Sequence, residues 1–105
     1  MNRETYLKTF RDLTEKMVAI TTAKNNDYAG FGDPFANFRE FGTFGFLVRM
    51  SDKWKRIKNL VGDGREPSVK DESVEDTLLD LATYALLLLC WLRNEKEEAG
   101  PVETV

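Results

Sequence analysis

Residues 75–92 read EDTLLDLATYALLLLCWL, and this stretch decides the fold. From Leu78 to Leu92 almost every residue is apolar, but Asp80 interrupts the run. The run is shorter than the roughly 20 apolar residues that a membrane-spanning helix needs, so it predicts a buried helix and no membrane partner. A carboxylate taken out of water is strongly unfavourable unless it is paired, hydrogen-bonded or metal-bound. We therefore expect Asp80 to face either a cationic side chain or a metal ion.

Apolar residues at steps of three and four predict two further helices. The first series predicts a helix over residues 3–24 and consists of Tyr6, Phe10, Leu13, Met17 and Ile20. The second predicts a helix from residue 43 or 44 to the GDG stop at residues 62–64 and consists of Phe46, Leu47, Met50, Trp54, Ile57 and Val61. The third helix is expected from residue 71 or 73 to residue 97, with a frayed tail over residues 98–105. A short extra helix is expected near residues 35–41.

Residues 24–38, KNNDYAGFGDPFANF, read as a loop because Asn, Asp, Gly and Pro dominate them. Four aromatic residues in this segment indicate an ordered loop that folds back onto the protein. We interpret Phe31, Phe35, Trp54 and Trp91 as core residues. The fold prediction is one all-α domain over residues 1–105, a small bundle of three main helices. Because the third helix is apolar on nearly every side, we expect a homo-oligomer, dimer or tetramer, to complete the bundle.

The composition excludes several classes of function. The net charge is −3 and no long basic block is present, so direct binding of duplex nucleic acid is not expected. The chain has no histidine, which removes Ser-His-Asp triads and imidazole zinc sites. Any metal must then be held by oxygen atoms, as Mg²⁺ or Mn²⁺ is. The single cysteine, Cys90, and the lack of a targeting signal predict a core thiol in a cytoplasmic protein.

The third helix carries a polar stripe, since residues four apart share one face: Asp76, Asp80 and Tyr84. Two carboxylates one turn apart suit a divalent cation. Two other interpretations stay open. Asp76 could complete a capping box with Ser73, and Asp80 could form a salt bridge with an Arg or Lys of the second helix.

Polar residues of the second helix recur at steps of three and four: Arg49, Asp52, Lys53, Arg56 and Asn59. They could form a solvated, mixed-charge face. Alternatively, Asp52 could join Asp76 and Asp80 around a metal while the cations meet phosphate oxygens. Such a combination is typical of a metal–polyphosphate site.

Three blocks of sequence carry a resemblance to a known family: KNNDYAGFGDPFANF, LVRMSDKWKRIKNL and DESVEDTLLDLATYALL. Over residues 24–89 the chain resembles the nucleotide-modification-associated domain family of phages and bacteria. That family is in turn distantly similar to the MazG-like all-α NTP pyrophosphohydrolases. The resemblance implies cleavage of a free NTP or dNTP to the monophosphate and pyrophosphate, with Mg²⁺ held by carboxylates on two neighbouring helices.

The chain departs from the MazG-like pattern, which has two acidic residues on each metal-binding helix. On the second helix only Asp52 is acidic, with Arg49 and Lys55 three residues away on either side. Either Glu72 or Glu75 would then complete the metal shell, or the site would bind fewer metals and rely on Arg49, Lys53 and Arg56. Glu72 or Glu75 could also orient the attacking water.

The resemblance also implies that part of the loop recognises the nucleotide, namely Lys24, Asn25, Asp27, Tyr28 and Asn37. Asn59 and Tyr84 would line the same substrate site. Two alternatives to the enzyme stay open: a non-catalytic nucleotide-binding accessory subunit, and a purely structural helical oligomer in which Asp80 pairs with Arg49 or Arg56.

Overall fold

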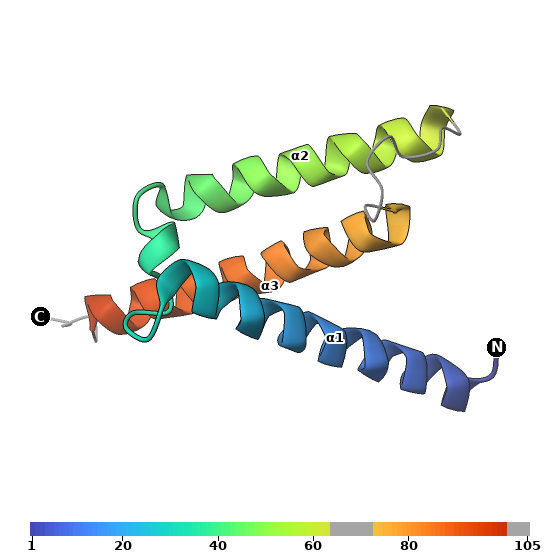
Figure 1. Cartoon of the computed structure of the whole chain (residues 1–105), viewed down its shortest axis with the longest axis horizontal. Coiled ribbons are helices and arrows are strands. Elements are labelled where there is room, and N and C mark those ends of the chain that lie inside the picture. Colours follow the sequence, from blue (N-terminus) through green and yellow to red (C-terminus); the bar gives the residue numbers. More distant parts are fainter. Residues whose placement is uncertain (64–72, 101–105) are drawn as a thin grey trace, which may run out of the picture. The chain divides into compact units, whose positions relative to one another are not determined.

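Three long helices and one short 3₁₀ helix make up the structure, a computed structural model that describes residues 1–63 and 73–100 (Figure 1). They are α1 (Arg3–Ala29), η1 (Ala36–Phe38), α2 (Gly42–Asp63) and α3 (Val74–Ala99). No strand occurs within those two described ranges. The all-α class, the three main helices and the short extra helix are therefore confirmed.

The chain divides into two compact units, Met1–Asn37 and Phe38–Val105. The first contains α1 and the loop that follows it, and the second contains α2 and α3. The single domain over residues 1–105 stays a prediction. No helix of the described chain is long and apolar enough to cross a membrane.

Helix α1 begins at a side-chain cap and ends later than its sequence predicts. The side chain of Asn2 accepts a hydrogen bond of 2.8 Å from the backbone N–H of Thr5, as N-cap residues do. The helix runs to Ala29, so the prediction of a loop from residue 24 onward is wrong for its first six residues. Asn and Asp cost only a few tenths of a kcal/mol relative to better helix formers, whereas Gly30 adopts a positive φ of 68° and stops the helix.

The loop after α1 is held by hydrogen bonds of its own. The Asn25 side-chain amide donates to the Pro34 carbonyl at 2.7 Å, and the Asp33 carboxylate accepts from the backbone N–H of Phe35 at 3.0 Å. Phe35 is half-buried, but Phe31 is fully exposed. The prediction that Phe31 is a core residue is therefore wrong, because these short-range bonds order the loop without burying its ring.

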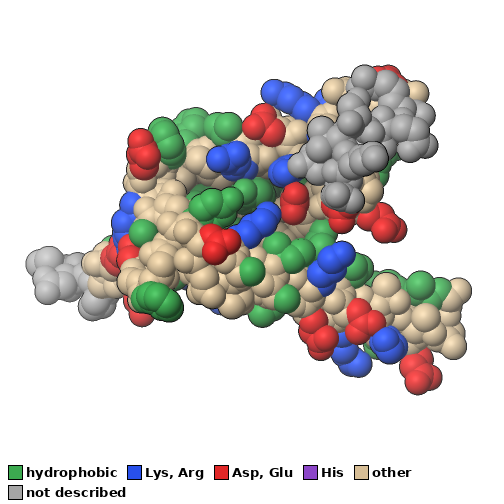
Figure 2. Space-filling view, in the orientation of Figure 1, with side chains coloured by type: hydrophobic (Ala, Val, Ile, Leu, Met, Phe, Trp, Pro, Cys, Tyr) green, Lys and Arg blue, Asp and Glu red, His purple; other side chains and the backbone are tan. Residues whose placement is uncertain are grey.

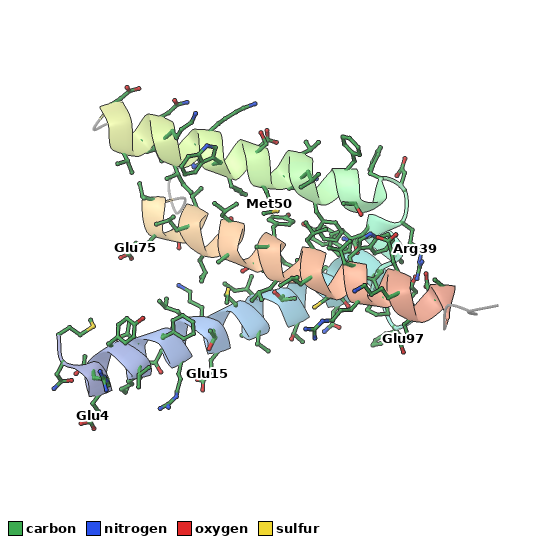
Figure 3. All side chains as sticks on the ribbon, turned by 180° about the vertical axis from the view of Figure 1, so that it is seen from behind. Glu4, Glu15, Arg39, Met50, Glu75 and Glu97 are labelled. Atoms are coloured by element: carbon green, nitrogen blue, oxygen red, sulfur yellow. The ribbon has the colours of Figure 1, made fainter. Side chains whose placement is uncertain are left out.

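Helices α2 and α3 lie side by side and run in opposite directions (Figure 1). Met50 points from α2 towards α3 in Figure 3. The buried residues of this unit are Phe46, Ile57 and Leu60 on α2, with Thr77 and Trp91 on α3. The predicted apolar series of α2 is thus only partly buried. Phe46 and Ile57 are buried and Met50 is half-buried, but Leu47, Trp54 and Val61 are exposed.

An aromatic cluster joins the start of α2 to the end of α3. The ring of Phe46 stacks on Phe38 at 4.5 Å between centroids and lies 6.1 Å from the ring of Trp91. The indole N–H of Trp91 donates to Thr43 Oγ1 at 3.2 Å. Arg39 lies over the same indole at 5.7 Å and pairs with Glu98 at 2.8 Å. We call the antiparallel pair of α2 and α3 the hairpin. This end of it is fixed by ring packing and two polar contacts.

Two predictions of burial on α2 and α3 are wrong. Trp54, although it lies on the apolar stripe of α2, is 53% exposed. Cys90 is exposed as well, so it is not a core thiol. Figure 2 shows hydrophobic side chains at the surface over the first half of α2, which agrees with the exposure of Phe44 and Val48. Much of the apolar surface of this unit therefore has no cover from within the unit.

Candidate functional site

Asp80 faces a lysine of the neighbouring helix. Its Oδ2 lies 3.1 Å from Nζ of Lys53 on α2. The Asp80 side chain is 34% exposed and that of Lys53 is 28% exposed. Asp80 is therefore paired but not dry, and water reaches both charged groups.

Thr77 lies about one turn before Asp80 on α3. It is polar but buried, with 2% of its surface exposed. Its hydroxyl donates to the Ser73 carbonyl at 2.9 Å and accepts from Nε of Arg56 at 3.2 Å. Arg56 is half-buried. The contact holds a guanidinium of α2 near the first turn of α3, about one helical turn from the Lys53–Asp80 pair.

Asp76 belongs to the cap of α3. Its Oδ2 accepts hydrogen bonds from the backbone N–H of Ser73 at 3.2 Å and from the Ser73 hydroxyl at 2.8 Å. The Ser73 hydroxyl oxygen in turn accepts from the backbone N–H of Asp76 at 3.1 Å. The capping-box interpretation is confirmed, with Asp in the position that Glu or Gln more often occupies.

The predicted metal ligands do not come together in the structure. Within residues 1–63 and 73–100, no three acidic or cysteine side chains lie close enough to hold a metal ion. Asp52 is exposed on α2, while Asp76 and Asp80 are engaged as described. A cage of three carboxylates is therefore not assembled by these residues of one copy.

A smaller site does fit the residues present. Mg²⁺ commonly keeps several waters and is held by one or two carboxylates together with substrate phosphates. Asp80 and Asp76 lie one turn apart on α3, and residues four apart share a helix face. This pair would hold the metal, and Asp52 would not be a ligand.

The two candidate general bases are Glu72 and Glu75. Glu72 lies outside the described residues. Glu75 is exposed in the first turn of α3, and Figure 3 shows it on the side of α3 away from α2.

Five predicted substrate residues lie in the second unit: Arg49, Lys53, Arg56, Asn59 and Tyr84. Arg49 and Asn59 are exposed on α2, and Tyr84 is half-buried on α3. Lys53 makes the ion pair with Asp80. The hairpin therefore brings Lys53, Asp80, Arg56 and Thr77 together at one level and leaves Arg49 and Asn59 in solvent.

The remaining predicted substrate residues lie in the first unit. Lys24, Asp27 and Tyr28 are exposed on the last turns of α1, and Asn37 is exposed within η1. Asn25 is half-buried, and its side-chain amide donates a hydrogen bond to the Pro34 carbonyl.

Two contacts that matter were not predicted from the sequence. Thr77 belongs to no periodic series of the sequence, because a single threonine next to an apolar run forms no pattern. Arg39 lies between the loop and α2, where no helix pattern places it, yet it contacts both Trp91 and Glu98. Thr77 lies three positions after Val74, the first residue of α3. A threonine at that position, with a cation on the facing helix, is the signal that could have found the first contact.

Comparisons of the chain with protein-family models, with curated proteins and with solved structures found no match. The resemblance to the nucleotide-modification-associated domain family stays a prediction that rests on the three sequence blocks.

Proposed function

We propose that the chain is a Mg²⁺-dependent pyrophosphohydrolase-like protein that acts on a free NTP or dNTP in the cytoplasm, in nucleotide pools linked to DNA base modification. The observation that best supports the proposal is the Lys53–Asp80 pair. It joins a cation and a carboxylate on two helices, and both are about one-third open to water. An exposed pair of this kind is worth little to stability, so its partners are easily redirected to a ligand.

Each group would have a separate task when a nucleotide binds. The ammonium of Lys53 and the guanidinium of Arg56 would neutralise phosphate oxygens, with Arg49 reaching in from solvent. Asp80 and Asp76 would hold Mg²⁺, which supplies charge neutralisation on the phosphates. Thr77 would keep Arg56 in place through the 3.2 Å hydrogen bond to its Nε.

The reaction would be attack of water on the α-phosphorus. The bond between that phosphorus and the oxygen bridging to the β-phosphorus breaks, and pyrophosphate leaves with the bonding electrons. A carboxylate, Glu72 or Glu75, would orient the water and take its proton. The other side chains act by position and charge, which is how proteins accelerate phosphoryl-type transfers.

A second candidate, a purely structural helical oligomer, is favoured by a different observation. Asp76 and Asp80 each already have a partner within the hairpin, one in the cap and one in the ion pair. A third candidate, the non-catalytic nucleotide-binding subunit, is favoured by the absence of a third carboxylate near this pair in the described chain.

A thermal-shift screen of the eight common NTPs and dNTPs, with and without Mg²⁺, separates these candidates. A ligand at about 100 times its dissociation constant adds roughly 2.7 kcal/mol to the free energy of unfolding. We expect one nucleotide to stabilise the protein only with Mg²⁺, and Asp80→Asn to abolish that gain. The matched control is Glu97→Gln, which neutralises an exposed carboxylate elsewhere on α3 and should keep the gain.

The stabilising nucleotide is then tested for release of pyrophosphate by the wild-type chain. Release supports the enzyme, and binding without release supports the accessory subunit. If no nucleotide stabilises the protein, the structural oligomer becomes the better account.

A further inference from the structure

The face of α3 opposite α2 carries a stripe of side chains that begins with one acidic residue and is otherwise apolar. We call it the outer stripe, and its members are Glu75, Leu78, Ala82, Ala85, Leu89 and Leu92; all are exposed except Ala85, which is half-buried. Its three leucines are between 41% and 53% exposed, whereas Thr77 and Trp91, which face α2, are buried. Leucines exposed in line along a helix mark an interaction surface.

The spacing of the outer stripe is that of a coiled-coil seam and is symmetric. Its members follow one another at steps of 3, 4, 3, 4 and 3 residues. A strict alternation of three and four residues lets two helices supercoil with their seams in contact. Because the steps are the same in both directions, a second copy that runs antiparallel meets the first in register.

The register pairs residues of complementary size. Leu78 lies opposite Leu89 of the second copy, and Ala82 lies opposite Ala85. Each of these pairs occurs twice, because the two-fold axis relates them. Leucine layers therefore flank two alanine layers, and small residues at the centre let the helix backbones approach closely.

The ends of the outer stripe carry opposite charges. Glu75 lies at its start, and Arg93 and Lys96 lie at its end; all three are exposed. In the antiparallel register Glu75 lies opposite Leu92 of the second copy, next to that copy's Arg93 and Lys96. Two further acids at this end, Glu95 and Glu98, are engaged by Thr43 and Arg39. Arg93 and Lys96 then outnumber Glu97 beside the stripe. A parallel pair would instead set Glu75 against Glu75 and Lys96 against Lys96, and like charges repel.

We propose that the outer stripe is the interface of an antiparallel, two-fold dimer of this chain. Such an interface is isologous, so one patch must complement itself in shape and charge. The symmetric spacing and the opposite charges at the two ends meet that demand, and a different partner would require neither. The proposal does not depend on the nucleotide chemistry proposed above.

The test measures the mass of the full chain in solution by light scattering and sedimentation. The wild-type should be a dimer, or a tetramer built from such dimers. Leu89→Glu places a charge in two layers of the interface and should raise the dimer dissociation constant by roughly 100-fold or more. Val48→Glu on α2 is the matched control, because Val48 is 55% exposed against 53% for Leu89; it should leave the mass unchanged.

A charge exchange provides the second arm and involves only exposed side chains. Glu75→Lys should weaken the dimer at low salt, and adding Arg93→Glu and Lys96→Glu to it should restore the dimer. A monomeric wild-type would overturn the proposal and leave the stripe to another occupant. Equal effects of Leu89→Glu and Val48→Glu, or a charge exchange that restores nothing, would overturn it as well.

Discussion

The two faces of α3 have opposite characters, although both belong to the same apolar run. The face towards α2 holds two polar residues that each contact α2: Thr77 contacts Arg56, and Asp80 contacts Lys53. The opposite face holds leucines that are half exposed. Apolar composition alone therefore does not indicate which side of α3 packs against α2. Here Thr77 and Asp80 lie on the side packed against α2, and the leucines lie on the side for which we propose a second copy as partner.

The largest expected effect comes from the aromatic cluster on the inner face. Trp91→Ala removes a ring that is 7% exposed and contacts Phe46, Thr43 and Arg39. We expect a loss of about 3–5 kcal/mol in the free energy of unfolding, measured by urea denaturation. Trp54→Ala is the control, because Trp54 is 53% exposed and should cost no more than about 1 kcal/mol. Equal losses would mean that Trp91 contributes no more to the stability of the hairpin than an exposed tryptophan does.

A second prediction concerns the buried hydroxyl of Thr77. Thr77→Val keeps the shape but removes the group that accepts from Arg56 Nε and donates to the Ser73 carbonyl. We expect a loss of about 1–3 kcal/mol by the same denaturation assay. Thr83→Val is the matched control, since the Thr83 hydroxyl bonds only the Leu79 carbonyl within its own helix in the described structure. A loss no larger than that of the control would remove Thr77 from the inner-face contacts.

The ion pair should have the smallest effect. A double-mutant cycle of Lys53→Met and Asp80→Asn should give a coupling energy of roughly 0.2–1 kcal/mol, because both groups are partly exposed. The coupling should fall further in high salt. A coupling of several kcal/mol would show a purely structural pair and would weaken the nucleotide proposal.

Much of this fold could be predicted from the sequence, because periodicity reports which residues of a helix share a face. The three helices, the short helix near Phe38 and the cap by Ser73 and Asp76 all follow from local signals. The end of α1 could not be predicted, since Asn25 and Asp27 are only mildly unfavourable in a helix and the stop depends on Gly30.

The site was harder to predict, because contacts between helices depend on their relative rotation. The sequence predicted a cation of the second helix for Asp80, but it could not choose Lys53 over Arg49 or Arg56. Trp54 and Trp91 look equivalent in an apolar pattern, and only the packing of α2 on α3 makes one exposed and the other buried. Asp52 was predicted to be a metal ligand because the sequence does not give the rotation of α2 relative to α3. The described structure does not bring it together with the other two carboxylates.

Disulfide trapping tests the central claim about the two faces of α3 most directly. In a Cys90→Ser background, which removes the native thiol, Leu78→Cys and Leu89→Cys are made singly and together. The account predicts covalent dimers under mild oxidation for the double variant alone, since Leu78 meets Leu89 only across an antiparallel pair and disulfides need Cα atoms within about 7 Å. Within one copy the two positions are separated by about three helical turns and cannot join. Covalent dimers of the single variants would show a parallel pair, and none from any variant would contradict the account.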